Sequence, residues 1–82
     1  MKTKYKYIHF VQELAGLHIS GQKFEWRCKN NKNGTDLGKF HFNGRWKCWE
    51  FWPDSTCAFT DDCLADIIDF MKQLKQPEFI GF

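Results

Sequence analysis

The sequence predicts an α+β fold, a four-stranded antiparallel β-meander with one C-terminal α-helix packed on one face. Three observations support this prediction. Residues 23–29 alternate apolar and charged side chains, which is typical of a half-buried strand. Asn43-Gly44 stands between two apolar runs, as in a tight hairpin. Between residues 61 and 75, apolar side chains recur at helical spacing.

The first two strands are expected over residues 5–11 and 23–29. The first run is rich in Tyr, Ile, Phe and Val, which favour strands. Residues 13–22 contain two glycines and are expected to form a wide connection. The second strand places three apolar side chains on one face and four charged ones on the other. An Asn- and Gly-rich turn follows it.

The third and fourth strands are expected over residues 37–42 and 45–52, with Pro53 ending the fourth. A two-residue type I′ loop at Asn43-Gly44 would place Phe42 opposite Arg45. A slip of one residue would exchange the two faces of the hairpin, so its register stays open. In the two-residue register one face carries Phe40, Phe42, Trp49 and Phe51, and the other carries Lys39, His41, Trp46, Cys48, Glu50 and Trp52.

The helix is expected over residues 61–75, with Thr60 as its cap and two aspartates in its first turn. If Ile68 lies in the core, Ile68→Ala should cost about 2–5 kcal/mol of stability. The apolar tail, residues 77–82, is expected to pack back on the sheet or to dock on a partner. The predicted core comprises Phe24, Trp26, Cys28, Leu64, Ile67, Ile68, Met71 and Leu74.

Length and composition indicate a single domain spanning residues 1–82. Fifteen aromatic rings and a net charge of only +2 exclude a disordered chain. No apolar run approaches the ~20 residues that a membrane span requires. The basic N-terminal residues lack the apolar segment of a signal peptide, so the expected compartment is the cytoplasm, with the four cysteines reduced.

The cysteine spacing argues against a metal site. Structural zinc sites hold closely paired cysteines, whereas 19, 8 and 5 residues separate Cys28, Cys48, Cys57 and Cys63. Cys63 stands near a helix start, which would favour a reactive thiolate, but the two preceding aspartates oppose it. We therefore expect no metal, no cofactor and no enzymatic activity.

Metal independence gives a testable prediction. Excess chelator should leave the melting temperature unchanged, because no pair of ligands is arranged to hold zinc. A thermal melt with and without chelator measures this. A drop of several degrees would show that the cysteines are ligands.

Charge and aromatic residues together indicate a binding protein. Residues 1–50 hold ten Lys or Arg against four acids, a difference of +6, while residues 51–82 hold two against six, a difference of −4. Such a dipolar molecule suits a polyanion, but also an acidic patch of a protein partner or antiparallel self-association. The alternative is single-stranded nucleic acid, whose bases stack on exposed aromatic rings. The candidate binding surface comprises Lys39, His41, Arg45, Trp46, Lys47 and Trp52.

A resemblance to a known family rests on several of the same positions. The pattern comprises Trp26-Arg27-Cys28, Asn30-Asn31, Leu37-Gly38, Trp46, Phe51-x-Pro53 and Cys63-Leu64-Ala65-Asp66-Ile67 through Phe70. It resembles a family of small uncharacterised proteins of bacterial mobile elements and phage-related regions. The resemblance implies a role in element maintenance or in countering host defence, by binding and occluding a larger target. This chain departs from the family at His41-Phe42-Asn43-Gly44, where a Trp-Tyr pair is expected.

Overall fold

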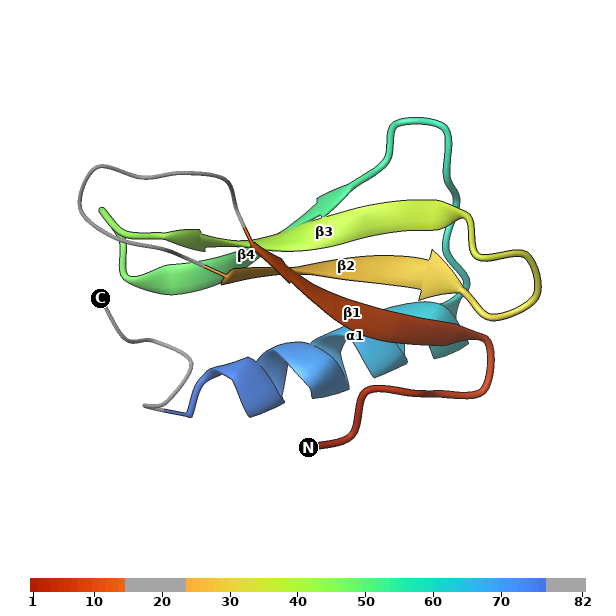
Figure 1. Ribbon diagram of the computed structural model, residues 1–82, viewed down its shortest axis with the longest axis horizontal. Coiled ribbons are helices and arrows are strands. Elements are labelled where there is room, and N and C mark those ends of the chain that lie inside the picture. The colour runs from red at the N-terminus through yellow and green to blue at the C-terminus, as the bar shows by residue number, and fades with distance from the viewer. Residues whose placement is uncertain (15–23, 77–82) are drawn as a thin grey trace.

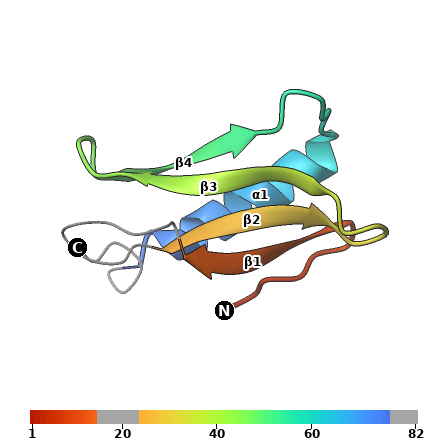
Figure 2. The same cartoon turned by 45° about the horizontal axis from the view of Figure 1, so that its top comes forward.

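A computed structural model describes residues 1–14 and 24–76 and contains one sheet and one helix (Figure 1). The antiparallel strands lie in the order β1-β2-β3-β4, and α1 packs across one face of the sheet (Figure 2). The predicted α+β meander is therefore confirmed. The elements are β1 (Ile8–Leu14), β2 (Phe24–Asn30), β3 (Asp36–Asn43), β4 (Cys48–Pro53) and α1 (Asp61–Leu74).

The first strand begins three residues later than the sequence predicts, at Ile8 instead of Tyr5. The preceding residues run back along the outer edge of β1. The backbone N–H of Tyr5 donates to Ile8 O at 2.8 Å, and that of Phe10 donates to Thr3 O at 2.8 Å. This path buries the ring of Tyr5, which packs edge-on against Phe10 at 5.8 Å. Tyr5 therefore belongs to the core but not to the strand.

The hairpin between β3 and β4 has a four-residue loop, residues 44–47, so the predicted two-residue loop is wrong. The side-chain Oδ1 of Asn43 accepts hydrogen bonds from the backbone N–H groups of Arg45 and Trp46, at 3.0 and 3.1 Å. Lys47 closes the loop with a φ of 54°. Asn43 thus organises the turn through its side chain.

The register follows from this longer loop. Phe42 pairs with Trp49, which lies four residues beyond the predicted partner, Arg45. Because four is an even number, every residue within the strands keeps the face predicted for it. Phe40, Phe42, Trp49 and Phe51 therefore share the face that α1 covers, as expected.

The helix begins where its cap predicts. Thr60 Oγ1 accepts a hydrogen bond from Cys63 N at 3.3 Å, and Asp61 and Asp62 occupy the first turn. The helix ends at Leu74, one residue before the predicted boundary, with Lys75 as its C-cap. Its buried residues face the sheet.

The core is a cluster of rings centred on Phe70. This side chain is fully buried and stacks on Phe10 with 4.0 Å between ring centroids and 7° between planes. Trp26 and Phe40 contact the same ring, at 5.1 and 5.4 Å. The buried residues of the described chain are Tyr5, Ile8, Phe10, Trp26, Cys28, Phe40, Ile67, Phe70 and Leu74.

The predicted helix face is wrong at two positions. Leu64 is 46% exposed and Ile68 is 54% exposed, while Phe70 is fully buried. The sheet presents aromatic side chains to the helix, and the helix is rotated so that the ring of Phe70 enters that layer. The expected loss of stability in Ile68→Ala assumed that this side chain lies in the core, and that assumption is wrong. Trp26, Cys28, Ile67 and Leu74 are buried as predicted and Met71 packs against the core, whereas the side chain of Phe24 lies outside the described part.

Tyr5 makes the stability of the folded domain depend on pH in the alkaline range. Its hydroxyl donates to Asp69 Oδ2 at 2.6 Å and accepts from Gln73 Nε2 at 3.0 Å. Burial, followed by the hydrogen bond to Asp69, raises the pKa of Tyr5 above its usual value of 10. The folded protein keeps this proton where the unfolded chain loses it. The stabilising contribution is complete below about pH 10 and declines as the pH rises toward the folded pKa.

We therefore expect the free energy of unfolding to fall above about pH 10, and to fall less steeply in Tyr5→Phe. Urea denaturation between about pH 7 and about pH 11 measures the slope. Tyr7→Phe is the control, since that ring is exposed. Equal slopes in the wild type and Tyr5→Phe would contradict the prediction.

Candidate functional site

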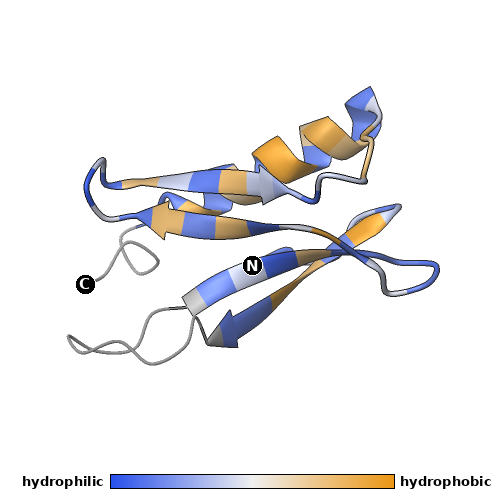
Figure 3. Cartoon of the chain, turned by 90° about the horizontal axis from the view of Figure 1, so that it is seen from above, coloured by the Kyte–Doolittle hydropathy of each residue, from blue (hydrophilic) through white to orange (hydrophobic). Residues whose placement is uncertain are grey.

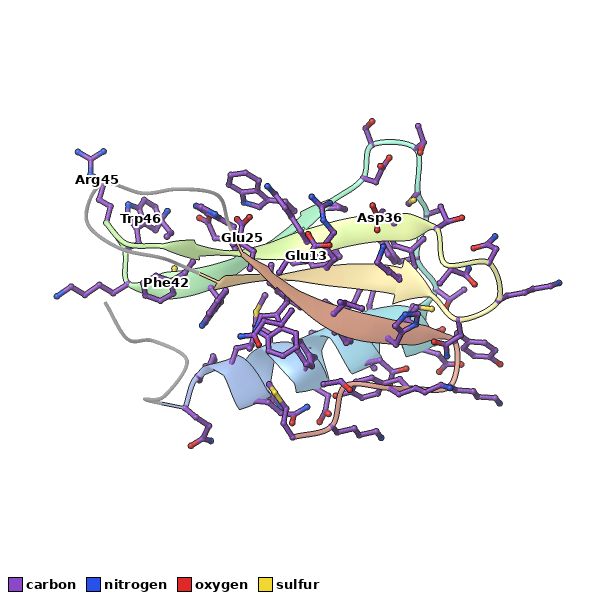
Figure 4. The ribbon with its side chains drawn as sticks, viewed as in Figure 1. Glu13, Glu25, Asp36, Phe42, Arg45 and Trp46 are labelled. Carbon is purple, nitrogen blue, oxygen red and sulfur yellow. The ribbon has the colours of Figure 1, made fainter. Side chains whose placement is uncertain are left out.

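The predicted binding residues separate into two groups. Lys39, His41 and Trp52 lie on the sheet face opposite α1, here called the open face. The other three lie in the β3–β4 loop, here called the hairpin tip and comprising residues 44–47. Figure 4 shows Arg45 and Trp46 at this end of the hairpin. One predicted surface is therefore two neighbouring features.

The strand register places side chains of the open face in rows. One row joins Val11, Arg27, Lys39 and Trp52, each the direct partner of the next. In the neighbouring row, Glu13 pairs with Glu25, and His41 pairs with Glu50. A hydrogen bond between His41 and Glu25 connects those two pairs. A cationic row thus lies beside an acidic one.

Glu25 and Glu50 hold the middle of the open face together. Glu25 Oε2 accepts from His41 Nδ1 at 2.8 Å, and its Oε1 lies 3.8 Å from Lys39 Nζ. Glu50 accepts from Asn43 Nδ2 at 3.0 Å and from Trp52 Nε1 at 3.1 Å. These hydrogen bonds, that of Asn43 first, hold the pKa of Glu50 below its usual value.

A second group of ion pairs surrounds Asp36. Lys29 Nζ lies 2.8 Å from Asp36 Oδ1, and Arg27 Nη1 lies 3.8 Å from its Oδ2. Arg27 Nε also donates to Glu13 Oε2 at 2.7 Å. The hydrogen bond from Lys29 is the main cause that lowers the pKa of Asp36. Three cations of the open face are therefore paired with carboxylates: Arg27, Lys29 and Lys39.

The open face is consequently not basic, which corrects the charge expected from the sequence. All four acids of the first fifty residues lie on it: Glu13, Glu25, Asp36 and Glu50. Among the described Lys and Arg in that half of the chain, three accompany them: Arg27, Lys29 and Lys39. The segment's charge of +6 therefore does not describe this surface.

Trp52 is the exposed aromatic side chain of the open face. It is 46% exposed, and its ring lies 4.6 Å from the ring of His41 and 5.2 Å from Lys39 Nζ. With its indole N–H bound to Glu50, the ring is held on three sides. Beside it lies a shallow depression of about 260 Å³, whose lining includes Arg27, Asp36 and Asp54. Trp52 is thus a fixed platform that lines a shallow depression together with charged side chains.

The hairpin tip differs in character. Trp46 is 75% exposed, the largest exposed fraction among the exposed large apolar side chains of the described chain. Arg45 and Lys47 are also exposed, and neither forms an ion pair with another described residue. The tip therefore offers an aromatic ring between two available cations.

Sequence reasoning missed Glu13, Glu25, Arg27 and Asp36 as parts of this surface. A signal for two of them was present, because Glu25 and Arg27 alternate with apolar residues and had to lie on the face opposite Trp26. The ion pairs could not be predicted, because they join β2 to β1 and β3, and the sequence does not give the register between these strands.

The cysteines do not form a metal site in the described ranges, where no group of three His, Cys, Asp or Glu residues could hold an ion. Burial raises the pKa of the Cys28 thiol to about 12, so this cysteine is a protonated, packed side chain at neutral pH. No helix of the described residues has the length and apolar character needed to cross a membrane.

No protein-family model, no curated protein and no solved structure matches this chain. The family resemblance stated above therefore stays a prediction.

Proposed function

We propose that this chain is a non-enzymatic binding module that recognises a protein partner through the open face. The observation that carries the proposal is Trp52, an exposed indole fixed by Glu50, His41 and Lys39. Protein interfaces are anchored by a few aromatic or Arg side chains within a polar surround, and a preordered ring loses little entropy on binding. Trp52 within its ion-paired surface has these properties.

Charge favours a protein partner over nucleic acid at the open face. Single-stranded nucleic acid requires cations that can contact successive phosphates. The cations of the two rows are paired with carboxylates, and Glu13, Glu25 and Glu50 would repel a phosphate backbone. Nucleic-acid binding remains the alternative for the hairpin tip alone, where Trp46 lies between Arg45 and Lys47.

The class of partner comes from the resemblance. A family encoded on mobile elements and in phage-related regions implies a host or defence factor as the target. A small binding module of the kind proposed would act on such a target by covering its surface. We therefore propose occlusion of a larger protein as the mode of action.

The test is a pull-down from the native host, scored for protein and nucleic acid together, with the wild type, Trp52→Ala and Trp46→Ala. We expect a protein to be captured, and Trp52→Ala to weaken its binding by at least about 2 kcal/mol, or about thirtyfold. The double variant Trp46→Ala/Trp52→Ala should abolish binding. Since both rings are exposed, each variant should keep a cooperative thermal melt.

Tryptophan fluorescence titration with an oligonucleotide at two salt concentrations separates the alternatives. A protein interface of this kind predicts weak oligonucleotide binding. Tight binding that falls steeply with salt and is lost in Trp46→Ala would contradict the proposal and favour the nucleic-acid alternative. Collapse of the fold in the double variant would show that the rings serve stability.

A further inference from the structure

The helix carries an apolar surface that the core does not use. Leu64 and Ile68 lie one turn apart on α1, both about half exposed. The helix thus carries these two apolar residues as well as its buried ones, and Figure 3 shows apolar bands along its length. We call the strip that contains them the outer stripe and define it by Asp61, Leu64, Ile68, Lys72 and Lys75.

The spacing of the outer stripe matches a helix-pairing surface. Its members follow one another at intervals of three or four residues, which keeps them on one side of an α-helix. The middle is apolar, the N-terminal end carries Asp61, and the C-terminal end carries Lys72 and Lys75. The stripe therefore has opposite charges at its two ends.

We propose that the outer stripe packs antiparallel against the outer stripe of a second copy of this chain, about a two-fold axis at Ile68. Asp61 and Lys75 lie seven residues either side of Ile68, so each would meet its opposite charge on the second copy. Leu64 would lie against the aliphatic stem of Lys72, and Ile68 against itself. A parallel pair would instead bring Asp61 against Asp61. An isologous, self-complementary contact of this kind closes at two copies.

The charges of the stripe are available for this contact. In the described part of the chain, Asp61, Lys72 and Lys75 form no ion pair. Among the described residues, the carboxylate of Asp61 accepts one hydrogen bond, from the backbone N–H of Asp62. Because α1 covers the other face of the sheet (Figure 1), the dimer leaves the open face accessible. Dimerisation through the outer stripe and partner binding through the open face can therefore be tested separately.

Sedimentation equilibrium over about 10 µM to about 1 mM tests the pairing. One helix pair buries less than the ~1,200 Å² of a standard interface, so we expect half-dimerisation at roughly 100 µM. The mean mass should rise from 9.8 kDa toward twice that value. Ile68→Glu brings two carboxylates together at the axis and should weaken the dimer at least tenfold. Val11→Glu, a change at an exposed residue of the open face, is the matched control and should have no effect.

Charge reversal tests the antiparallel geometry with exposed residues. Asp61→Lys alone and Lys75→Glu alone each place like charges at both ends of the pair, and each should weaken the dimer at least fivefold. An equimolar mixture of the two variants restores opposite charges at both ends and should form a heterodimer of wild-type affinity. Circular dichroism melts establish that each variant is folded.

Three results would overturn the inference. The first is a monomeric wild type at every concentration. The second is a dimer that is unaffected by folded Ile68→Glu. The third is a mixture of Asp61→Lys and Lys75→Glu that associates no better than either alone. A dimer lost in Trp52→Ala but kept in Ile68→Glu would show instead that the open face mediates self-association.

Discussion

Replacing Phe70 by alanine is expected to lower the free energy of unfolding by about 3–5 kcal/mol. The ring is fully buried between helix and sheet, stacked on Phe10 and in contact with Trp26 and Phe40. Its removal leaves a cavity that three rigid rings cannot close, and the aromatic contacts are lost as well. Guanidinium chloride denaturation measures the loss. For a domain of this size it removes a large fraction of the total stability.

Ile68→Ala is the matched control on the same helix. Its side chain is half exposed, so its truncation should cost less than about 1 kcal/mol. Alanine has the higher helix propensity, which reduces the loss further. Comparable losses for Phe70→Ala and Ile68→Ala would show that the helix is rotated about its axis relative to the sheet described above.

Replacing Gly38 by alanine is expected to cost at least about 1–3 kcal/mol. A Cβ at this position would lie 2.7 Å from Phe51 Cζ and 2.7 Å from the backbone O of Trp52. The ring could shift, but the carbonyl oxygen could move only by distorting β4. Urea denaturation measures the loss, and thermal melts should show the same order of stability.

Gly34→Ala separates crowding from backbone strain. Gly34 has a φ of +71°, but nothing lies within 4 Å of an added Cβ. The free energy of unfolding of this variant should therefore fall only by the cost of a left-handed backbone in a residue with a Cβ, about 1–2 kcal/mol. We expect Gly38→Ala also to reduce partner binding, because the oxygen that it displaces belongs to Trp52. A Gly38→Ala variant with wild-type stability would contradict the close packing of β3 on β4.

The faces of the strands could be predicted from the sequence, because alternation determines them independently of register. Phe40, Phe42, Trp49 and Phe51 face the helix although the hairpin loop is twice as long as expected. The loop could not be predicted, since Asn43 favours either a type I′ turn or a turn closed by its own side chain. The rings of Phe42 and Trp49 lie 5.4 Å apart because the turn is the one closed by the side chain of Asn43.

The helix face and the charge of the open face depend on contacts distant in sequence. Apolar residues occupy more than one stripe of α1, and the aromatic layer of the sheet determines which stripe is buried. The sum of charges over a segment cannot tell which strand face carries them. Glu25 neutralises Lys39 and contacts His41 because β2 lies beside β3, a fact that only the register provides.

The two outer strands of the sheet are protected in ways that limit how this protein can aggregate. The free edge of β1 is partly occupied by the N-terminal residues, through the bonds at Tyr5 and Phe10. The opposite edge, β4, has only six residues and ends at Pro53, which has no N–H to donate. Short or covered edges resist the addition of a further strand, the step from which fibrils grow. A domain with so many rings can therefore display two exposed indoles while part of its strand edge is closed to the addition of another strand.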